Sequence, residues 1–196
     1  MFDPGQNYAS LEIIAECEAE RKLLAIPAAI LEQAWRREAQ IEAVIDAVLH
    51  TTFGGDPDGY AQARHVGEWC ARIAMELPYG PDRSFARRVG VLRDIDPDIL
   101  AALPETAIFV DHVREYQGLH VGAVAERTMS HIVAVADEFA STITPGANGV
   151  SFSPRRALAI MKAGATSSNA AIIDALERAI AAGSITQSRR WTDKSA

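Results

Sequence analysis

Apolar residues recur every three or four positions along most of the chain, which is the spacing of one face of an α-helix. The longest such run extends from Ile30 to Leu49, and we expect it to form the longest helix. No stretch of the sequence sustains the alternation of apolar and polar residues that is typical of a β-strand. The pattern therefore predicts an all-α protein.

Prolines, glycines and capping residues divide this pattern into separate helices. Ser10 is the expected N-cap of a first helix that ends before Pro27, and the glycine-rich segment 54–59 is an expected loop. Ser153 is the expected N-cap of a later helix, and Gly183 is the expected C-terminal cap of the last one. After the helix that begins at Ser10 and the long helix over residues 30–49, further helices are expected over residues 66–77, 85–92, 108–116, 121–139, 154–163 and 169–182.

Length and charge restrict the class of protein. With 196 residues, the chain is long enough for one large domain with an appendage. Its net charge of -7 argues against a nucleic-acid partner, because phosphate contacts need clustered Lys and Arg. No segment is long and apolar enough to span a bilayer, and the N-terminus lacks the basic and apolar pattern of a signal peptide. We therefore expect a cytoplasmic protein that binds neither nucleic acid nor membrane.

Three blocks of the sequence contain residues that are able to carry chemistry. The first follows Tyr60 and contains His65 and Trp69, the second is the run RRVGVLRDI at 87–95, and the third is the run IVAVADEF at 132–139. A lone histidine on a helix is more often structural than catalytic. Spacing alone therefore says little, and it is the residues around His65, taken together with the two later blocks, that are informative.

These blocks resemble the HD superfamily of phosphohydrolases, and in particular its HD-GYP branch, in which a first histidine, an adjacent His-Asp pair and a final aspartate hold divalent metals. The runs SPRRAL at 153–158 and IIDAL at 172–176 are similar to the closing helices of that branch. The resemblance extends from about Ile41 to Ala182. It implies a compact HD-domain-like helical bundle over residues 41–185, with an N-terminal helical extension over residues 1–40 and a flexible tail over residues 186–196.

The resemblance also implies a set of site residues. It places His65 at the first histidine ligand, Asp94 at the aspartate of the pair, and Asp137 at the last aspartate. Arg93 stands where the paired histidine belongs, and a guanidinium has no lone pair with which to bind a metal. The GYP tripeptide is missing, and only His112 matches that part of the branch. The implied metal ligands are therefore His65, Asp94 and Asp137, with His112 as a further candidate.

Arg93 itself has two expected roles. If the helices pack as in the family, its charge lies among Asp94, Asp137 and His65 and replaces the metal with a buried ion pair. Buried carboxylates without any cation would cost several kcal/mol, which favours such compensation. The alternative is that Arg93 turns to solvent.

Three functions follow from these expectations. The leading hypothesis is a degenerate HD-GYP-like domain without a cofactor, which acts as a non-catalytic regulatory module in bacterial signalling and binds a nucleotide ligand or a signalling protein. The alternative is a metal-dependent phosphohydrolase or cyclic di-GMP phosphodiesterase, with one weakly held Fe, Mn or Mg ion and Asp94 as its catalytic residue. The third is a structural scaffold in which His65 and Asp137 serve only helix packing. The N-terminal extension is expected to cover the domain's own core or to pair with another copy in a homodimer.

Overall fold

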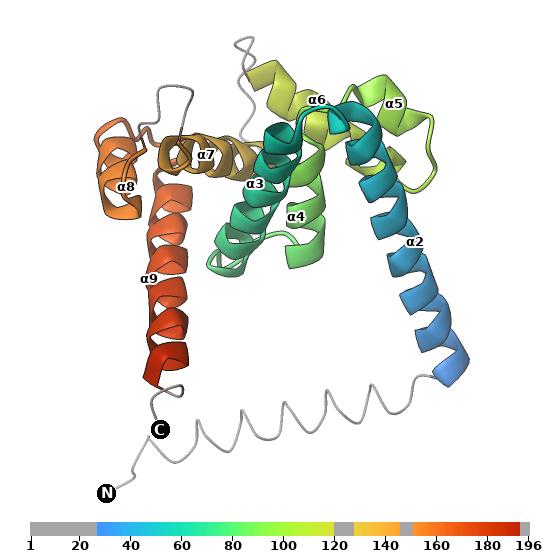
Figure 1. Ribbon diagram of the computed structural model, residues 1–196, viewed down its shortest axis with the longest axis horizontal. Coiled ribbons are helices and arrows are strands. Elements are labelled where there is room, and N and C mark those ends of the chain that lie inside the picture. The colour runs from blue at the N-terminus through green and yellow to red at the C-terminus, as the bar shows by residue number, and fades with distance from the viewer. Residues whose placement is uncertain (1–26, 120–127, 146–150, 193–196) are drawn as a thin grey trace, which may run out of the picture. The chain divides into compact units, whose positions relative to one another are not determined.

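The computed structural model describes residues 27–119, 128–145 and 151–192 (Figure 1). Every regular element within these ranges is a helix, which confirms the all-α prediction, and α2 is the longest, as expected. The elements are α2 (Ala28–Phe53), α3 (Pro57–Met75), α4 (Arg83–Leu92), α5 (Pro97–Ala101), the 3-10 helix η1 (Ala107–Phe109), α6 (Val110–Leu119), α7 (Thr128–Ile143), α8 (Pro154–Ala163) and α9 (Ala170–Thr192). None of the described helices has the length and apolar character needed to cross a membrane. The helix expected after Ser10 lies outside the described residues.

The chain divides into two compact units, Met1–Ala43 and Val44–Ala196, and the boundary falls within α2. In the first unit, the described residues form the first part of α2, and nearly all of their side chains are exposed. The second unit contains the remaining helices and the candidate site.

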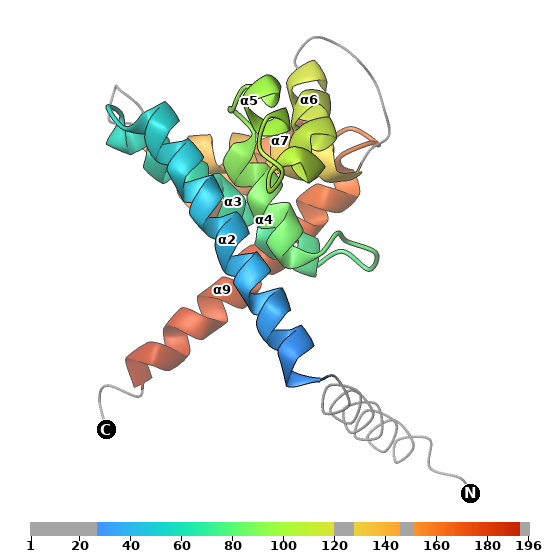
Figure 2. The same cartoon turned by 90° about the vertical axis from the view of Figure 1, so that its right-hand side faces the viewer.

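Helix α3 is central to the second unit and packs against α4, α7 and α9. Helices α6 and α8 also pack against α7, and α5 packs against α6 (Figures 1 and 2). Removal of apolar side chains from water at these interfaces provides the main stabilisation of the fold. The largest side chains that are almost fully buried in this unit include Phe109, Phe139, Ile45, Leu49, Ile73, Leu92, Ile132 and Leu176.

Two glycines allow α3 and α4 to approach each other closely. A Cβ atom built on Gly90 would lie 2.5 Å from Cys70 Sγ and 3.1 Å from the Cα atom of Gly67. A Cβ atom on Gly67 would meet the carbonyl oxygen of Arg87 at 2.8 Å. The absence of side chains at both positions therefore sets the separation of the two helices, and it brings the end of α4, with Arg93, into the interior.

The loop expected over residues 54–59 is shorter in the structure. Asp56 is the N-cap of α3 and accepts a hydrogen bond from the Gly59 amide at 2.9 Å. Pro57 occupies the first turn, where its fixed φ angle suits a helix and its missing N–H is not needed. The prediction was wrong for residues 57–59, because the same turn-forming residues also suit the start of a helix.

The prediction that Gly183 caps the last helix was also wrong. Helix α9 continues through Gly183 to Thr192, so it includes residues 186–192 of the expected tail. A glycine in a helix interior costs only about 1 kcal/mol relative to alanine, and no proline follows before Thr192. By contrast, Ser153 caps α8 as expected and accepts a hydrogen bond from the Arg156 amide at 3.4 Å.

Candidate functional site

Arg93 lies at the end of α4 and is only 4% exposed. Its Nε atom is 2.9 Å from Asp137 Oδ1, and its Nη2 atom is 2.9 Å from Asp94 Oδ2. Its Nη1 atom donates to the Gly90 carbonyl oxygen at 3.4 Å. The guanidinium therefore lies between the two aspartates that the resemblance implies as metal ligands, and it does not turn to solvent.

A second layer of hydrogen bonds holds this ion pair in place from α6. The Tyr116 hydroxyl donates to Asp137 Oδ2 at 3.0 Å. The Gln117 side-chain amide donates to the carbonyl oxygens of Arg93 at 3.0 Å and Ile95 at 3.1 Å, just beyond the end of α4. Helices α4, α6 and α7 thus meet at one connected group. We call it the Arg93 network: Arg93, Asp94, Tyr116, Gln117 and Asp137.

The environment of Tyr116 keeps its hydroxyl protonated. Burial raises the pKa of the phenol, and the negative charge of Asp137 and the hydrogen bond to that carboxylate raise it further. Tyr116 therefore acts as a neutral donor to Asp137 at neutral pH. Burial likewise raises the pKa of the neighbouring Cys70 thiol, so this cysteine is an inert packing residue.

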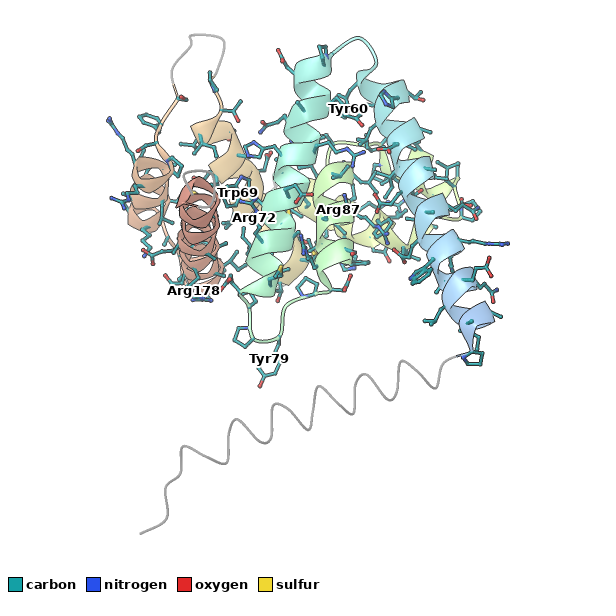
Figure 3. All side chains as sticks on the ribbon, turned by 60° about the horizontal axis from the view of Figure 1, so that its bottom comes forward. Tyr60, Trp69, Arg72, Tyr79, Arg87 and Arg178 are labelled. Atoms are coloured by element: carbon teal, nitrogen blue, oxygen red, sulfur yellow. The ribbon has the colours of Figure 1, made fainter. Side chains whose placement is uncertain are left out.

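His65 lies on α3 and has a local partner. Its Nε2 atom accepts a hydrogen bond from Trp69 Nε1 at 2.9 Å. The Trp69 ring meets Phe139 edge-on, with ring centroids 4.8 Å apart, and the Arg72 guanidinium carbon lies 4.8 Å from the centroid of the same ring (Figure 3). Burial lowers the pKa of His65, and the charge of Arg72 lowers it further. His65 is therefore a neutral imidazole whose Nε2 lone pair is directed at Trp69.

This lowered pKa predicts a loss of stability in acid. In the unfolded chain His65 has its ordinary pKa of 6.5, so as the pH falls below that value the unfolded state takes up a proton before the folded state does. The free energy of unfolding should therefore decrease from pH 6.5 downward through the lowered folded pKa. We expect His65→Gln, which keeps an acceptor for Trp69 but does not titrate, to show a weaker decrease in urea unfolding measured on both sides of pH 6.5. The exposed His50→Gln is the matched control, and an equal pH dependence in both variants would exclude this role for His65.

His112, the further candidate ligand, lies on α6 and packs against α4. Its ring meets Phe85 edge-on at a centroid distance of 5.2 Å. Its Nδ1 atom is buried and has no hydrogen-bond partner among the described residues. The contact that the structure gives to His112 is therefore an apolar one.

Within residues 27–119, 128–145 and 151–182, no group of three or more His, Cys, Asp or Glu side chains is arranged to hold a metal ion. The structure brings Asp94 and Asp137 together through Arg93, while His65 is bonded to Trp69. The chemistry of this donor set does not fit a divalent metal, because a permanently charged group without a lone pair lies between the carboxylates. What the arrangement does is place one positive charge between two carboxylates and join three helices.

Tyr116 and Gln117 belong to the site, but sequence reasoning did not select them. Tyr116 is the last residue of the helix that the apolar pattern predicts over residues 108–116, and it is buried, at 3% exposed. A buried tyrosine usually needs a partner for its hydroxyl, so the same pattern also contained a sign that a polar group lies nearby.

Comparisons with protein families, curated proteins and solved structures give no match to the chain. The resemblance to the HD superfamily therefore depends on the motifs described above.

Proposed function

We propose that this chain is a degenerate HD-GYP-like domain that acts as a non-catalytic regulatory module in bacterial signalling and binds a nucleotide ligand or a protein partner. One observation supports the proposal most directly, namely the position of the Arg93 guanidinium 2.9 Å from both Asp94 and Asp137. A metal-dependent phosphohydrolase needs such carboxylates to hold the ion that activates water and neutralises the phosphoryl oxygens. Here, a positively charged side chain of the protein already lies between them.

A metal ion would have to compete with this ion pair. Displacement of the guanidinium would leave a positive charge in a position that is only 4% exposed, where an unpaired charge costs several kcal/mol. Asp137 would also have to bind the metal with a carboxylate that already accepts a hydrogen bond from the Tyr116 hydroxyl. These costs favour the module without a metal over the enzyme with one weakly held ion.

Metal content tests the proposal. We expect protein purified without a chelator to contain iron, manganese and magnesium far below one equivalent, as measured by plasma mass spectrometry. The Asp94→Ala variant should give the same values, because Asp94 Oδ2 pairs with Arg93 Nη2.

Stoichiometric iron or manganese that is lost in Asp94→Ala would instead support the phosphohydrolase, and a screen with cyclic dinucleotides would then follow. If the metal content is low, calorimetric titration of the chain with cyclic di-GMP separates a nucleotide-binding module from a partner-binding or purely structural one. The homodimer expected from the sequence stays a prediction that the mass in solution decides.

A further inference from the structure

Helix α8 has an exposed face that is both basic and apolar. Three apolar residues of this helix are buried: Ala157, Leu158 and Met161. The side that points away from them consists of four exposed residues, which we call the α8 face: Arg155, Arg156, Ala159 and Ile160. Ile160 is 48% exposed, and the guanidinium carbon of Arg156 lies 4.8 Å from the centroid of the Phe152 ring. This face therefore presents two positive charges beside an apolar side chain.

The arginines of the α8 face have no carboxylate partner. No ion pair joins either of them to a residue that the structure describes. Residues 139–173 contain no Asp or Glu. The two acids of the adjoining α9, Asp174 and Glu177, lie instead 3.9 and 2.6 Å from the Nζ atom of Lys162. Both guanidinium groups are therefore available to carboxylates of another molecule.

A second exposed face is formed by α5, η1 and the start of α6. Ile108, Asp111 and Arg114 follow one another at a spacing of three residues, so they lie along one side of η1 and α6. Arg114 Nη2 lies 3.1 Å from Asp98 Oδ1, which joins α5 to the same surface. Ile108 is 59% exposed, and Ile99, the neighbour of Asp98, is 48% exposed. We call this surface the α5–α6 face: Asp98, Ile99, Ile108 and Asp111.

The charge around the α5–α6 face is negative. Residues 94–113 contain five Asp and Glu residues and no Lys or Arg. The flanking Arg93 and Arg114 each pair with one of these aspartates, so neither arginine offsets the remaining acids. Asp111 forms no ion pair with any residue that the structure describes. The α5–α6 face is therefore complementary in charge to the α8 face.

The exposed isoleucines follow the same division. Three isoleucines in the described part of the second unit are largely exposed, and all of them belong to these two faces. A single exposed apolar residue is common, but apolar side chains beside charges of opposite sign on two faces are typical of surfaces that bind each other. We propose that the α8 face of one copy of the chain binds the α5–α6 face of a second copy. The arginines then lie against the aspartates, and the isoleucines pack together.

This contact joins the copies head to tail. Within one chain α8 packs against α7 and α9, whereas α5 packs against α6 and η1, and Figure 1 shows α8 and α5 at opposite ends of the second unit. One partner therefore cannot cover both faces, so each added copy leaves one face of each kind free and association continues beyond two copies. The inference is independent of the function proposed above, because neither face contains a residue of the Arg93 network.

Sedimentation equilibrium of the full chain tests the proposal. We expect the average mass to rise with protein concentration beyond that of two chains, and to fall when salt is added, because salt screens exposed charges. The variants Arg155→Glu/Arg156→Glu and Ile99→Ser/Ile108→Ser should each keep the mass of one chain at the same concentrations. All four positions are exposed, so the fold should persist, as circular dichroism will verify.

A mixture of the two variants distinguishes a head-to-tail contact from other arrangements. Each variant retains the face that the other has lost, so an equimolar mixture should reach the mass of two chains and no more. Two matched controls should associate like the natural chain. Arg36→Glu/Arg37→Glu changes an exposed pair of arginines outside both faces, and Met75→Ser/Tyr79→Ser removes two exposed apolar side chains after α3.

Four results would overturn the proposal. A natural chain that keeps the mass of one copy up to about 1 mM has no such interface. Association that stops at two copies, or that survives in both face variants, would assign the contact to another surface. A mixture of the two variants that keeps the mass of one chain would show that these faces do not bind each other.

Discussion

Replacement of Arg93 by methionine is expected to lower the free energy of unfolding by about 2–4 kcal/mol. Methionine fills a similar volume, but it removes the guanidinium that pairs with both Asp94 and Asp137. The Arg93 side chain is 5% exposed, whereas those of Asp94 and Asp137 are 49% and 30% exposed. Water therefore solvates the two carboxylates in part, and this places the loss at the lower end of the range for buried pairs. Urea unfolding followed by circular dichroism measures it.

A double-mutant cycle isolates the ion pair within this loss. The variant Arg93→Met/Asp137→Asn should lose less than the sum of the two single variants, because removal of one partner already forfeits the interaction. Arg114→Met is the matched control, since Arg114 pairs with Asp98 at the surface and exposed pairs contribute at most about 1 kcal/mol. An Arg93→Met variant as stable as the natural chain would refute a stabilising role for the Arg93 network.

The second large effect is expected at Gly90, where alanine should destabilise the protein by about 1–3 kcal/mol. In an exposed helix the same change stabilises by about 1 kcal/mol, because alanine is the better helix former. At Gly90 the added methyl group would lie 2.5 Å from Cys70 Sγ and 3.1 Å from the Cα atom of Gly67, so α3 and α4 would have to separate. Urea unfolding again gives the change in stability.

Gly118→Ala provides the matched comparison. Gly118 lies in α6, and a Cβ atom built there meets nothing within 4 Å. This variant should be as stable as the natural chain or more stable by up to about 1 kcal/mol. A Gly90→Ala variant that is stabilised as much as Gly118→Ala would mean that α3 and α4 are not in close contact at Gly90.

The parts of the fold that could be predicted depend on neighbours in sequence. Helical periodicity and the N-cap at Ser153 are local properties, and they predicted the all-α class and the first residue of α8. The errors in helix bounds arose where one local sequence signal is compatible with two different backbone structures. The segment Pro57–Gly59 suits both a turn and the first turn of a helix, and Gly183 is tolerated in a helix when no proline follows it.

The candidate site depended on contacts that sequence alone does not determine. Asp137 is 44 residues from Arg93, so the choice between an ion pair and a solvated arginine is made only when α4 and α7 pack. His65 shows the opposite case. Its partner Trp69 is four residues away on the same helix. This spacing alone could have indicated that the indole N–H bonds to the imidazole nitrogen that a metal would need.

The cation between Asp94 and Asp137 belongs to the chain itself, and in this it differs from a bound metal ion. A bound ion stabilises a protein in proportion to the logarithm of its free concentration, so a site of that kind reports the supply of the ion and empties on dilution or chelation. A guanidinium that belongs to the chain cannot dissociate from it, so its presence does not depend on any free concentration in solution. The positive charge between Asp94 and Asp137 is therefore present in every copy that folds, and no ion has to be taken up from solution to place a cation between these two side chains.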